Sequence, residues 1–179
     1  MKKIRQFSFA AINLVKNKKI GIGFLKKLCY SNRIREREKW RRFMMTLFVK
    51  ENEEMKVVST DKAPAALGPY SQGYVHNGMF YSAGQVPINP ATGEIEATTI
   101  EGQTEQVCKN LGAVLEAAGT GFDKVVKTTC FVADMGDFAA FNEVYAKYFT
   151  SKPARSCVAV KTLPKNALCE VELIAVVEE

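Results

Sequence analysis

Three side chains in the last quarter of the sequence could together hold a small anionic molecule. Arg155 and Cys157 stand two residues apart in an apolar segment, so on a β-strand they would share one face. Glu170 lies in the next apolar segment, and side chains of neighbouring antiparallel strands can converge. A guanidinium group matches a carboxylate through two parallel hydrogen bonds, and such a contact contributes roughly 1.5–3 kcal/mol. The trio therefore predicts a carboxylate-binding site; the competing interpretation is an Arg155–Glu170 ion pair without a ligand.

Two glycine-containing segments could complete such a site. In Gly68-Pro69-Tyr70, the tyrosine hydroxyl can donate a hydrogen bond. In Ala83-Gly84-Gln85, the glycine allows a close approach of the backbone, so that its N–H could face a ligand. A glycine within a strand also marks a β-bulge, so each segment alone is a weak signal.

The histidine and cysteine content limits the classes of site. The single histidine, His76, excludes a histidine-rich zinc site, and its place beside the turn signal Asn77-Gly78 is typical of an exposed strand end. The five cysteines are odd in number and form no C-x-x-C pair. This pattern indicates free thiols in a reducing compartment such as the cytoplasm, rather than a disulfide framework.

The elements that must position these residues follow from hydrophobic periodicity and turn signals. Two helices are expected: the first begins with a capping box of Thr98 and Glu101 and ends at Gly119, and the second begins at Asp137. Five strands are expected, each bounded by turn residues: 71–76, 79–86, 124–133, 155–161 and 168–177. The order β-β-α-β-α-β-β predicts an α+β fold, a mixed sheet with both helices packed on one face.

The last strand suggests what covers the other face of the sheet. Its residues alternate between an apolar set suited to the helices and an opposite set that includes Glu170 and Glu172. Burying these carboxylates within one chain would be costly unless they were paired. This face is therefore expected to meet either water or another subunit.

The net charge of +6 is unevenly distributed along the 179 residues. Residues 1–55 hold 15 basic and 5 acidic residues, whereas residues 56–179 hold 10 basic and 14 acidic residues and carry a charge of −4. The acidic part does not favour nucleic acid as a partner. No apolar run of about 18 residues predicts a membrane span.

The first 55 residues are interpreted as a basic extension, separate from a domain at 56–179. A transit peptide to the mitochondrial matrix and a membrane- or RNA-binding tail are two interpretations. The favoured one is an upstream extension that is never made, with translation starting at Met55. Residues 50–54, Lys-Glu-Asn-Glu-Glu, would be encoded almost entirely by purines, as in a ribosome-binding site.

Several segments, in order, resemble the RidA/YjgF family of reactive intermediate deaminases. They are Ala63-Pro64-Ala65-Ala66-Leu67-Gly68-Pro69-Tyr70-Ser71-Gln72-Gly73, Ser82-Ala83-Gly84-Gln85-Val86-Pro87, Glu116-Ala117-Ala118-Gly119, Val126-Lys127-Thr128-Thr129, Pro153-Ala154-Arg155-Ser156-Cys157-Val158 and Glu170-Val171-Glu172. The resemblance spans about residues 56–178, and residues 1–55 have no counterpart.

The resemblance implies a chorismate-mutase-like fold in a homotrimer, with active clefts between subunits. It implies hydrolysis of 2-iminobutanoate and 2-iminopropanoate, which leak from pyridoxal-phosphate dehydratases, to 2-keto acids and ammonia, without a metal or organic cofactor. Arg155 would bind the substrate carboxylate, Glu170 would position water or act as general acid and base, and Cys157 would line the pocket. Tyr70 and the Ala83–Gly84 backbone would complete it.

Two departures from the family pattern affect these expectations. Ala83 stands where many members have serine, which removes one hydrogen bond to substrate or water. The link from Phe149 to Pro153 is short, which bears on the cleft rim and substrate size. Two other functions remain open: an RNA-cleaving translation inhibitor, and a metabolite sensor or holdase that binds without turnover.

Overall fold

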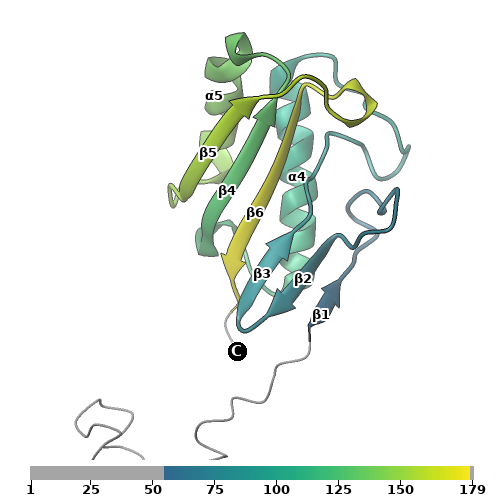
Figure 1. Ribbon diagram of the computed structural model, residues 1–179, viewed down its shortest axis with the longest axis vertical. Helices are drawn as coiled ribbons and strands as arrows, with labels where there is room; N and C mark the ends of the chain where they lie inside the picture. Colours follow the sequence, from purple (N-terminus) through teal and green to yellow (C-terminus); the bar gives the residue numbers. More distant parts are fainter. Residues whose placement is uncertain (1–54, 178–179) are drawn as a thin grey trace, which may run out of the picture. The chain divides into compact units, whose positions relative to one another are not determined.

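The computed structural model describes residues 55–177, so the expectations for residues 1–54 lie outside the described residues. The described part is an α+β unit of one six-stranded mixed sheet and two α-helices (Figure 1), which confirms the predicted fold class, mixed sheet and number of helices. The strands are β1 Lys56–Val58, β2 Gly73–His76, β3 Met79–Ser82, β4 Val125–Val132, β5 Ala154–Ala159 and β6 Cys169–Val176. The helices are α4 Ile100–Ala118 and α5 Phe138–Tyr148. The short strand β1 was not predicted from the sequence.

The strands lie in the order β1-β2-β3-β6-β4-β5. β4 and β5 are parallel, because the chain crosses between them through α5, and the other neighbours are antiparallel. The expectation that the strands carrying Arg155 and Glu170 are antiparallel neighbours is therefore wrong. β4 lies between β5 and β6, since the crossover places β5 on one side of β4 and leaves the other side for β6.

Both helices pack on one face of the sheet, behind it in Figure 1. The core between them and the sheet is built from alternate residues of β4 and β6 and from the apolar stripes of the helices. Phe80, Leu111, Phe141 and Leu173 are among its fully buried members. The opposite side, called the open face below, has no covering layer within residues 55–177 (Figure 1).

The helix starts differ in detail from the prediction. Thr99, not Thr98, caps α4, because its hydroxyl accepts a hydrogen bond from the Gly102 N–H at 3.3 Å. Gly119 closes α4 in a left-handed conformation with φ of 77°, as expected. Asp137 occupies the cap position of α5 but makes no side-chain capping bond. Asp134 accepts from the Gly136 N–H instead and caps the preceding 3-10 turn.

Candidate functional site

Arg155 lies at the exposed edge of the sheet, on the side of the helices. It pairs in register with Thr128 of β4, whose side chain is fully buried on the helix side. The guanidinium carbon lies 4.7 Å from the centre of the Tyr145 ring and 5.5 Å from that of Phe138. Both rings belong to α5, so cation–π contacts hold the arginine against this helix.

Asn142 fixes the orientation of the guanidinium group and was missed from the sequence. Its Oδ1 accepts a hydrogen bond from Nη1 of Arg155 at 2.7 Å. Arginine has five N–H donors, so this bond leaves most of the fork for a ligand. The available signal was spacing: Phe138, Asn142 and Tyr145 lie four and three residues apart on one helical face.

Cys157 follows Arg155 on the same face of β5, as predicted. It pairs with Cys130 and is half-buried. Burial raises the pKa of the Cys157 thiol, and the nearby Arg155 charge only partly opposes this effect. The thiol is therefore neutral near pH 7 and is not an activated nucleophile in this chain alone.

Glu170 lies on the open face, in direct contact with Gly84. Gln85 and Val171 exchange two backbone hydrogen bonds of 2.9 and 3.1 Å, which bring the two segments side by side. A Cβ atom on Gly84 would overlap Oε1 of Glu170 and lie 2.8 Å from its Cδ. Glycine is thus required here so that the carboxylate can lie against the backbone.

Burial raises the pKa of the Glu170 carboxyl group, and the negative charge of Glu172 raises it further. Both carboxylates project from the open face of β6, as the alternation predicted. A carboxyl group whose pKa is moved upward exchanges its proton more readily at neutral pH than an ordinary glutamate. Glu170 is therefore suited to acid–base chemistry.

Arg155 and Glu170 do not converge within one chain, which corrects the sequence-based expectation. Arg155 is level with Thr128 on the helix side, whereas Glu170 is level with Phe131 and faces the other way. With β4 between them and three residues of offset, their Cα atoms are roughly 14 Å apart by strand geometry. The alternative of an Arg155–Glu170 ion pair is wrong for the same reason. The chain thus presents two half-sites: Arg155 with Cys157, and Glu170 with Gly84.

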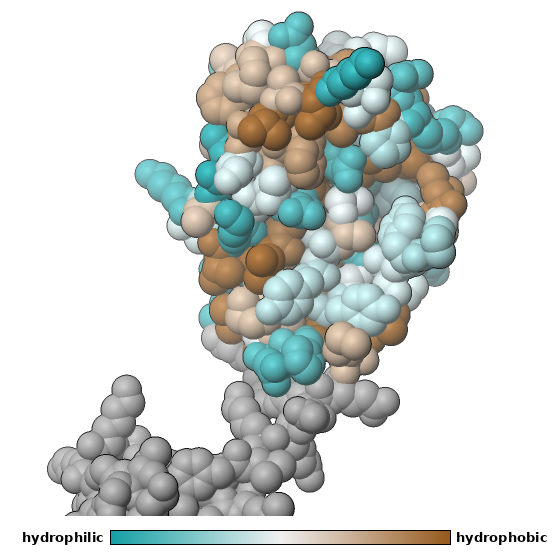
Figure 2. Space-filling view, viewed as in Figure 1, coloured by the Kyte–Doolittle hydropathy of each residue, from teal (hydrophilic) through white to brown (hydrophobic). Residues whose placement is uncertain are grey.

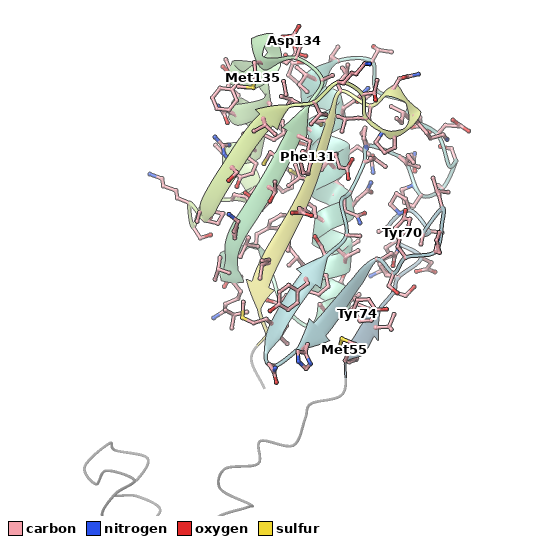
Figure 3. All side chains as sticks on the ribbon, in the orientation of Figure 1. Met55, Tyr70, Tyr74, Phe131, Asp134 and Met135 are labelled. Atoms are coloured by element: carbon pink, nitrogen blue, oxygen red, sulfur yellow. The ribbon has the colours of Figure 1, made fainter. Side chains whose placement is uncertain are left out.

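The loop that carries Tyr70 adjoins the second half-site. The Ala83 N–H donates to the Gln72 carbonyl at 2.9 Å, so the loop that carries Tyr70 adjoins the Ala83–Gly84 segment. Figure 3 places Tyr70 at the rim of the open face and Phe131 near its middle. The Tyr70 hydroxyl accepts from the Leu67 N–H at 3.2 Å. A cavity of about 380 Å³, lined by Tyr70, Gln72 and residues 57–61, opens next to it, away from Arg155.

The open face carries exposed apolar and aromatic side chains in register across the sheet. The exposed Val57, Tyr74 and Tyr81 and the half-buried Ile174 form one row over β1, β2, β3 and β6. Tyr81 is 45% exposed and Val57 53%. Figure 2 shows hydrophobic patches (brown) between polar side chains on this face. Apolar surface of this kind is characteristic of a protein contact.

Comparison with protein families and known proteins places the described domain among known relatives. The family model described as Endoribonuclease L-PSP matches residues 60–177. AldR of Lactococcus lactis, named as a regulator, is 53% identical over 125 residues, which are 69% of this chain and 99% of AldR. The 2-iminobutanoate/2-iminopropanoate deaminase of Escherichia coli is 46% identical over 125 residues, 68% of this chain and 97% of that protein.

A plant relative and a solved structure extend the comparison. The chloroplastic Reactive Intermediate Deaminase A of Arabidopsis thaliana is 50% identical over 121 residues, which cover 67% of this chain and 65% of that protein. The crystal structure of E. coli TdcF with bound serine superposes with a TM-score of 0.66 at 41% identity. The superposed region covers 69% of this chain and 99% of TdcF.

Proposed function

The chain belongs to the endoribonuclease L-PSP family, which includes the RidA, YjgF and RutC proteins, and on that premise we propose that it hydrolyses 2-imino acids to 2-keto acids and ammonia. The substrates would be 2-iminobutanoate and 2-iminopropanoate, as the name of the E. coli relative describes for that protein. The observation that carries the proposal is the half-buried Glu170 carboxyl group held against the Gly84 backbone. Such a group can move a proton beside a small bound molecule.

The complete site would form between two copies of the chain. Arg155 and Glu170 face opposite sides of the sheet, so they can meet only if one copy brings its β5 edge to the open face of another. This contact is head-to-tail, and head-to-tail contacts that close give rings. A homotrimer would contain three clefts, each with Arg155 and Cys157 from one subunit and Glu170, Gly84 and Tyr70 from the next. The exposed apolar row on the open face supports such a contact.

Within the cleft, the reaction needs little more than orientation. The free donors of Arg155 would bind the substrate carboxylate and place the imine carbon beside Glu170. Water adds to the protonated imine carbon while Glu170 accepts one proton of the water. The same carboxyl group gives this proton to the nitrogen. As the C–N bond breaks, Glu170 accepts the hydroxyl proton, so that the carbonyl forms and ammonia leaves, and this last proton then passes from Glu170 to solvent. Cys157, a neutral thiol, would form one wall.

Ala83 bears on how fast this reaction runs. Its backbone N–H is already bonded to Gln72, and its side chain is a methyl group where many relatives have a serine hydroxyl. One hydrogen bond to water or substrate is thus missing. Since such a bond contributes about 1 kcal/mol, Ala83→Ser is expected to raise kcat/KM by about fivefold.

The direct experiment couples the protein to a threonine dehydratase and follows ammonia release from the imine that the dehydratase produces. The protein should accelerate this release, and Arg155→Ala should abolish the acceleration. Catalysis that persists in both Arg155→Ala and Arg155→Lys would refute the proposal. Binding of a small carboxylate without any turnover in the wild type would instead support a sensor, in line with the regulator name of AldR.

RNA cleavage is the second candidate, favoured by the family description Endoribonuclease L-PSP. The net charge of −4 on residues 56–179 opposes it, because RNA-binding surfaces neutralise phosphates with basic residues. Binding of RNA by residues 56–179 that weakens steeply with salt would support this candidate. Salt-independent or absent binding would reject it.

We propose that the mature protein starts at Met55 and lies in the cytoplasm, since the four cysteines within residues 55–177 are free thiols. As a separate finding, no helix within residues 55–177 is long and apolar enough to cross a membrane. The chloroplastic location in the Arabidopsis relative's name makes an organelle the alternative, reached through residues 1–55 as a transit peptide. Mass determination of the amino terminus of the native protein distinguishes the two, since a start at Met55 and a cleaved longer precursor differ in mass.

A further inference from the structure

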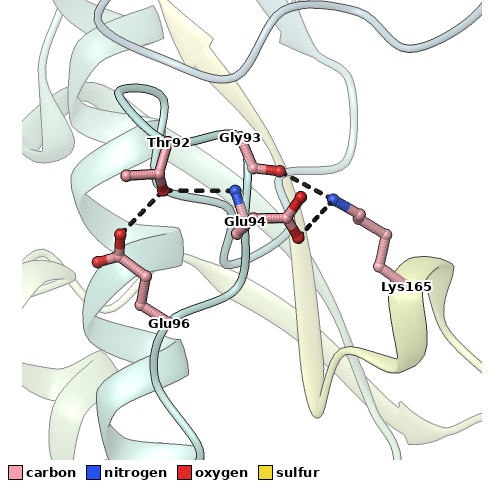
Figure 4. Close-up of polar contacts among 5 residues, drawn as sticks. All are labelled: Thr92, Gly93, Glu94, Glu96 and Lys165. Atoms are coloured by element: carbon pink, nitrogen blue, oxygen red, sulfur yellow. Dashed lines mark hydrogen bonds and ion pairs between the residues drawn. The ribbon is translucent and has the colours of Figure 1, made fainter.

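Two loops frame the contact between Gly84 and Glu170. Residues 86–99 follow Gly84 and lead to α4, and residues 160–168 lead to β6. On the surface, Lys165 joins these loops (Figure 4). Its Nζ donates to the Gly93 carbonyl at 2.8 Å and lies 3.1 Å from Oε2 of Glu94. A second connection between the same loops lies in the interior.

Gln103, in the first turn of α4, makes the interior connection. Its side chain is buried, with 5% exposed. Nε2 donates to the Ala97 carbonyl at 2.9 Å, and Oε1 accepts from the Leu168 N–H at 2.7 Å. The next residue, Thr104, lies with its Oγ1 3.6 Å from Sγ of Cys169. The start of α4 therefore contacts both residues that precede Glu170.

These contacts hold the backbone of Glu170 from both sides. Before it, the Leu168 carbonyl also accepts from the Ala133 N–H at 2.9 Å. After it, Val171 exchanges two hydrogen bonds with Gln85. With the backbone fixed at residues 168 and 171, the side chain of Glu170 starts from a fixed point on the open face, where its carboxylate lies against Gly84.

We propose that Gln103 is a positioning residue, which fixes the start of β6 and thereby holds the Glu170 carboxylate over Gly84. The effect of Gln103 on turnover rests on the proposed function, whereas the effect of Gln103 on the environment of Glu170 does not. Gln103→Met keeps the volume of the side chain but leaves the Leu168 N–H and the Ala97 carbonyl without partners. The start of β6 then loosens, and water reaches Glu170.

Two readouts test this proposal separately. NMR titration of ¹³C-labelled glutamate, with the signal of Glu170 assigned through Glu170→Gln, reports its environment whether or not the protein is an imine deaminase. The ionisable side chains on the open face of its own and neighbouring strands (Glu172, Lys127 and Tyr81) are unchanged in every variant. Ammonia release reports kcat and KM.

Gln103→Met should lower the Glu170 pKa toward its ordinary value and reduce kcat about tenfold, with KM changing less. Lys165→Met, which removes the surface connection, should change neither. Val114→Ala, which opens a cavity eleven residues further along α4, should lower stability without moving the Glu170 pKa. Gln103→Glu should not lower the Glu170 pKa, because a carboxyl oxygen at this position can still accept the hydrogen bond from the Leu168 N–H.

An unchanged Glu170 titration in Gln103→Met would overturn the proposal, as would an equal shift in Val114→Ala. If Gln103→Met does not fold, the Glu170 titration in Gln103→Glu tests the proposal instead. A Gln103→Glu protein that folds but has the low-pKa Glu170 signal contradicts the role assigned to the Leu168 contact. If the wild type releases no ammonia but the titrations behave as described, the proposed function fails and the positioning role stands.

Discussion

Replacing Gly84 by alanine should damage activity far more than stability. The added methyl group would overlap Oε1 of Glu170 and lie 2.8 Å from Cδ and 3.1 Å from Cγ. Ordinary contacts between carbon atoms are about 3.5–4.0 Å, so the carboxylate must move by roughly 1 Å. A displacement of this size at a reacting group costs about a hundredfold in rate. We therefore expect kcat/KM for ammonia release to fall about a hundredfold.

The stability of Gly84→Ala should remain within about 1 kcal/mol of the wild type. Swinging the half-buried Glu170 side chain off its rotamer costs about 0.5–1.5 kcal/mol. Gly84 is not among the glycines with positive φ in residues 55–177, so alanine fits the backbone and gains about 0.4–1 kcal/mol from a less flexible unfolded chain. The two effects largely cancel. Urea unfolding at equal protomer concentration measures the net change in the free energy of unfolding.

Gly93→Ala is the matched control for this prediction. Gly93 has φ of 74° and no neighbouring heavy atom within 4 Å of an added Cβ. Alanine there should cost about 1–2 kcal/mol of backbone strain and leave kcat/KM unchanged. Full activity in Gly84→Ala, or an equal loss of activity in Gly93→Ala, would refute the reasoning.

Three further predictions concern the charged groups and the thiol. Arg155→Lys should raise KM and lower kcat/KM at least about tenfold, since a lysine cannot bind a carboxylate bidentately; steady-state ammonia release measures this. Cys157→Ser should retain activity within about fivefold in the same assay, because the thiol is neutral, and complete loss would assign it a covalent role. Because burial raises the Glu170 pKa, the folded state binds its proton more tightly than the unfolded chain. The wild type should therefore lose stability as the pH rises from the ordinary value of 4.5 through the raised pKa, and Glu170→Gln should not; urea unfolding across this range checks the difference.

The sequence predicted the elements well because their signals are local. Asn77 and Gly78 adopt φ of 52° and 70° and close the predicted hairpin. The apolar stripe of the first helix is buried against the sheet, and Gly119 ends it in the left-handed conformation. Alternation along β5 and β6 also assigned Arg155, Cys157 and Glu170 correctly to faces of their own strands.

The relation between strands was harder to predict, because it is set by contacts far apart in the sequence. Alternation gives the faces of a strand but not its neighbours, so the parallel pairing of β4 with β5 was missed. The error placed Arg155 and Glu170 on one face. Asn142 was missed for a different reason: an asparagine on an aromatic helix stripe has no distinctive local signal until β5 brings Arg155 to it.

A subunit-mixing experiment tests the central claim that each site combines two half-sites from different chains. Arg155→Ala and Glu170→Ala proteins, each inactive alone, are unfolded together in equal amounts and refolded, and mass spectrometry of the native assembly verifies that both variants are present in one oligomer. In a head-to-tail ring, about one cleft in four then receives both intact residues. Recovery of about a quarter of wild-type ammonia release is the predicted result. Mixed oligomers with no activity would contradict the account.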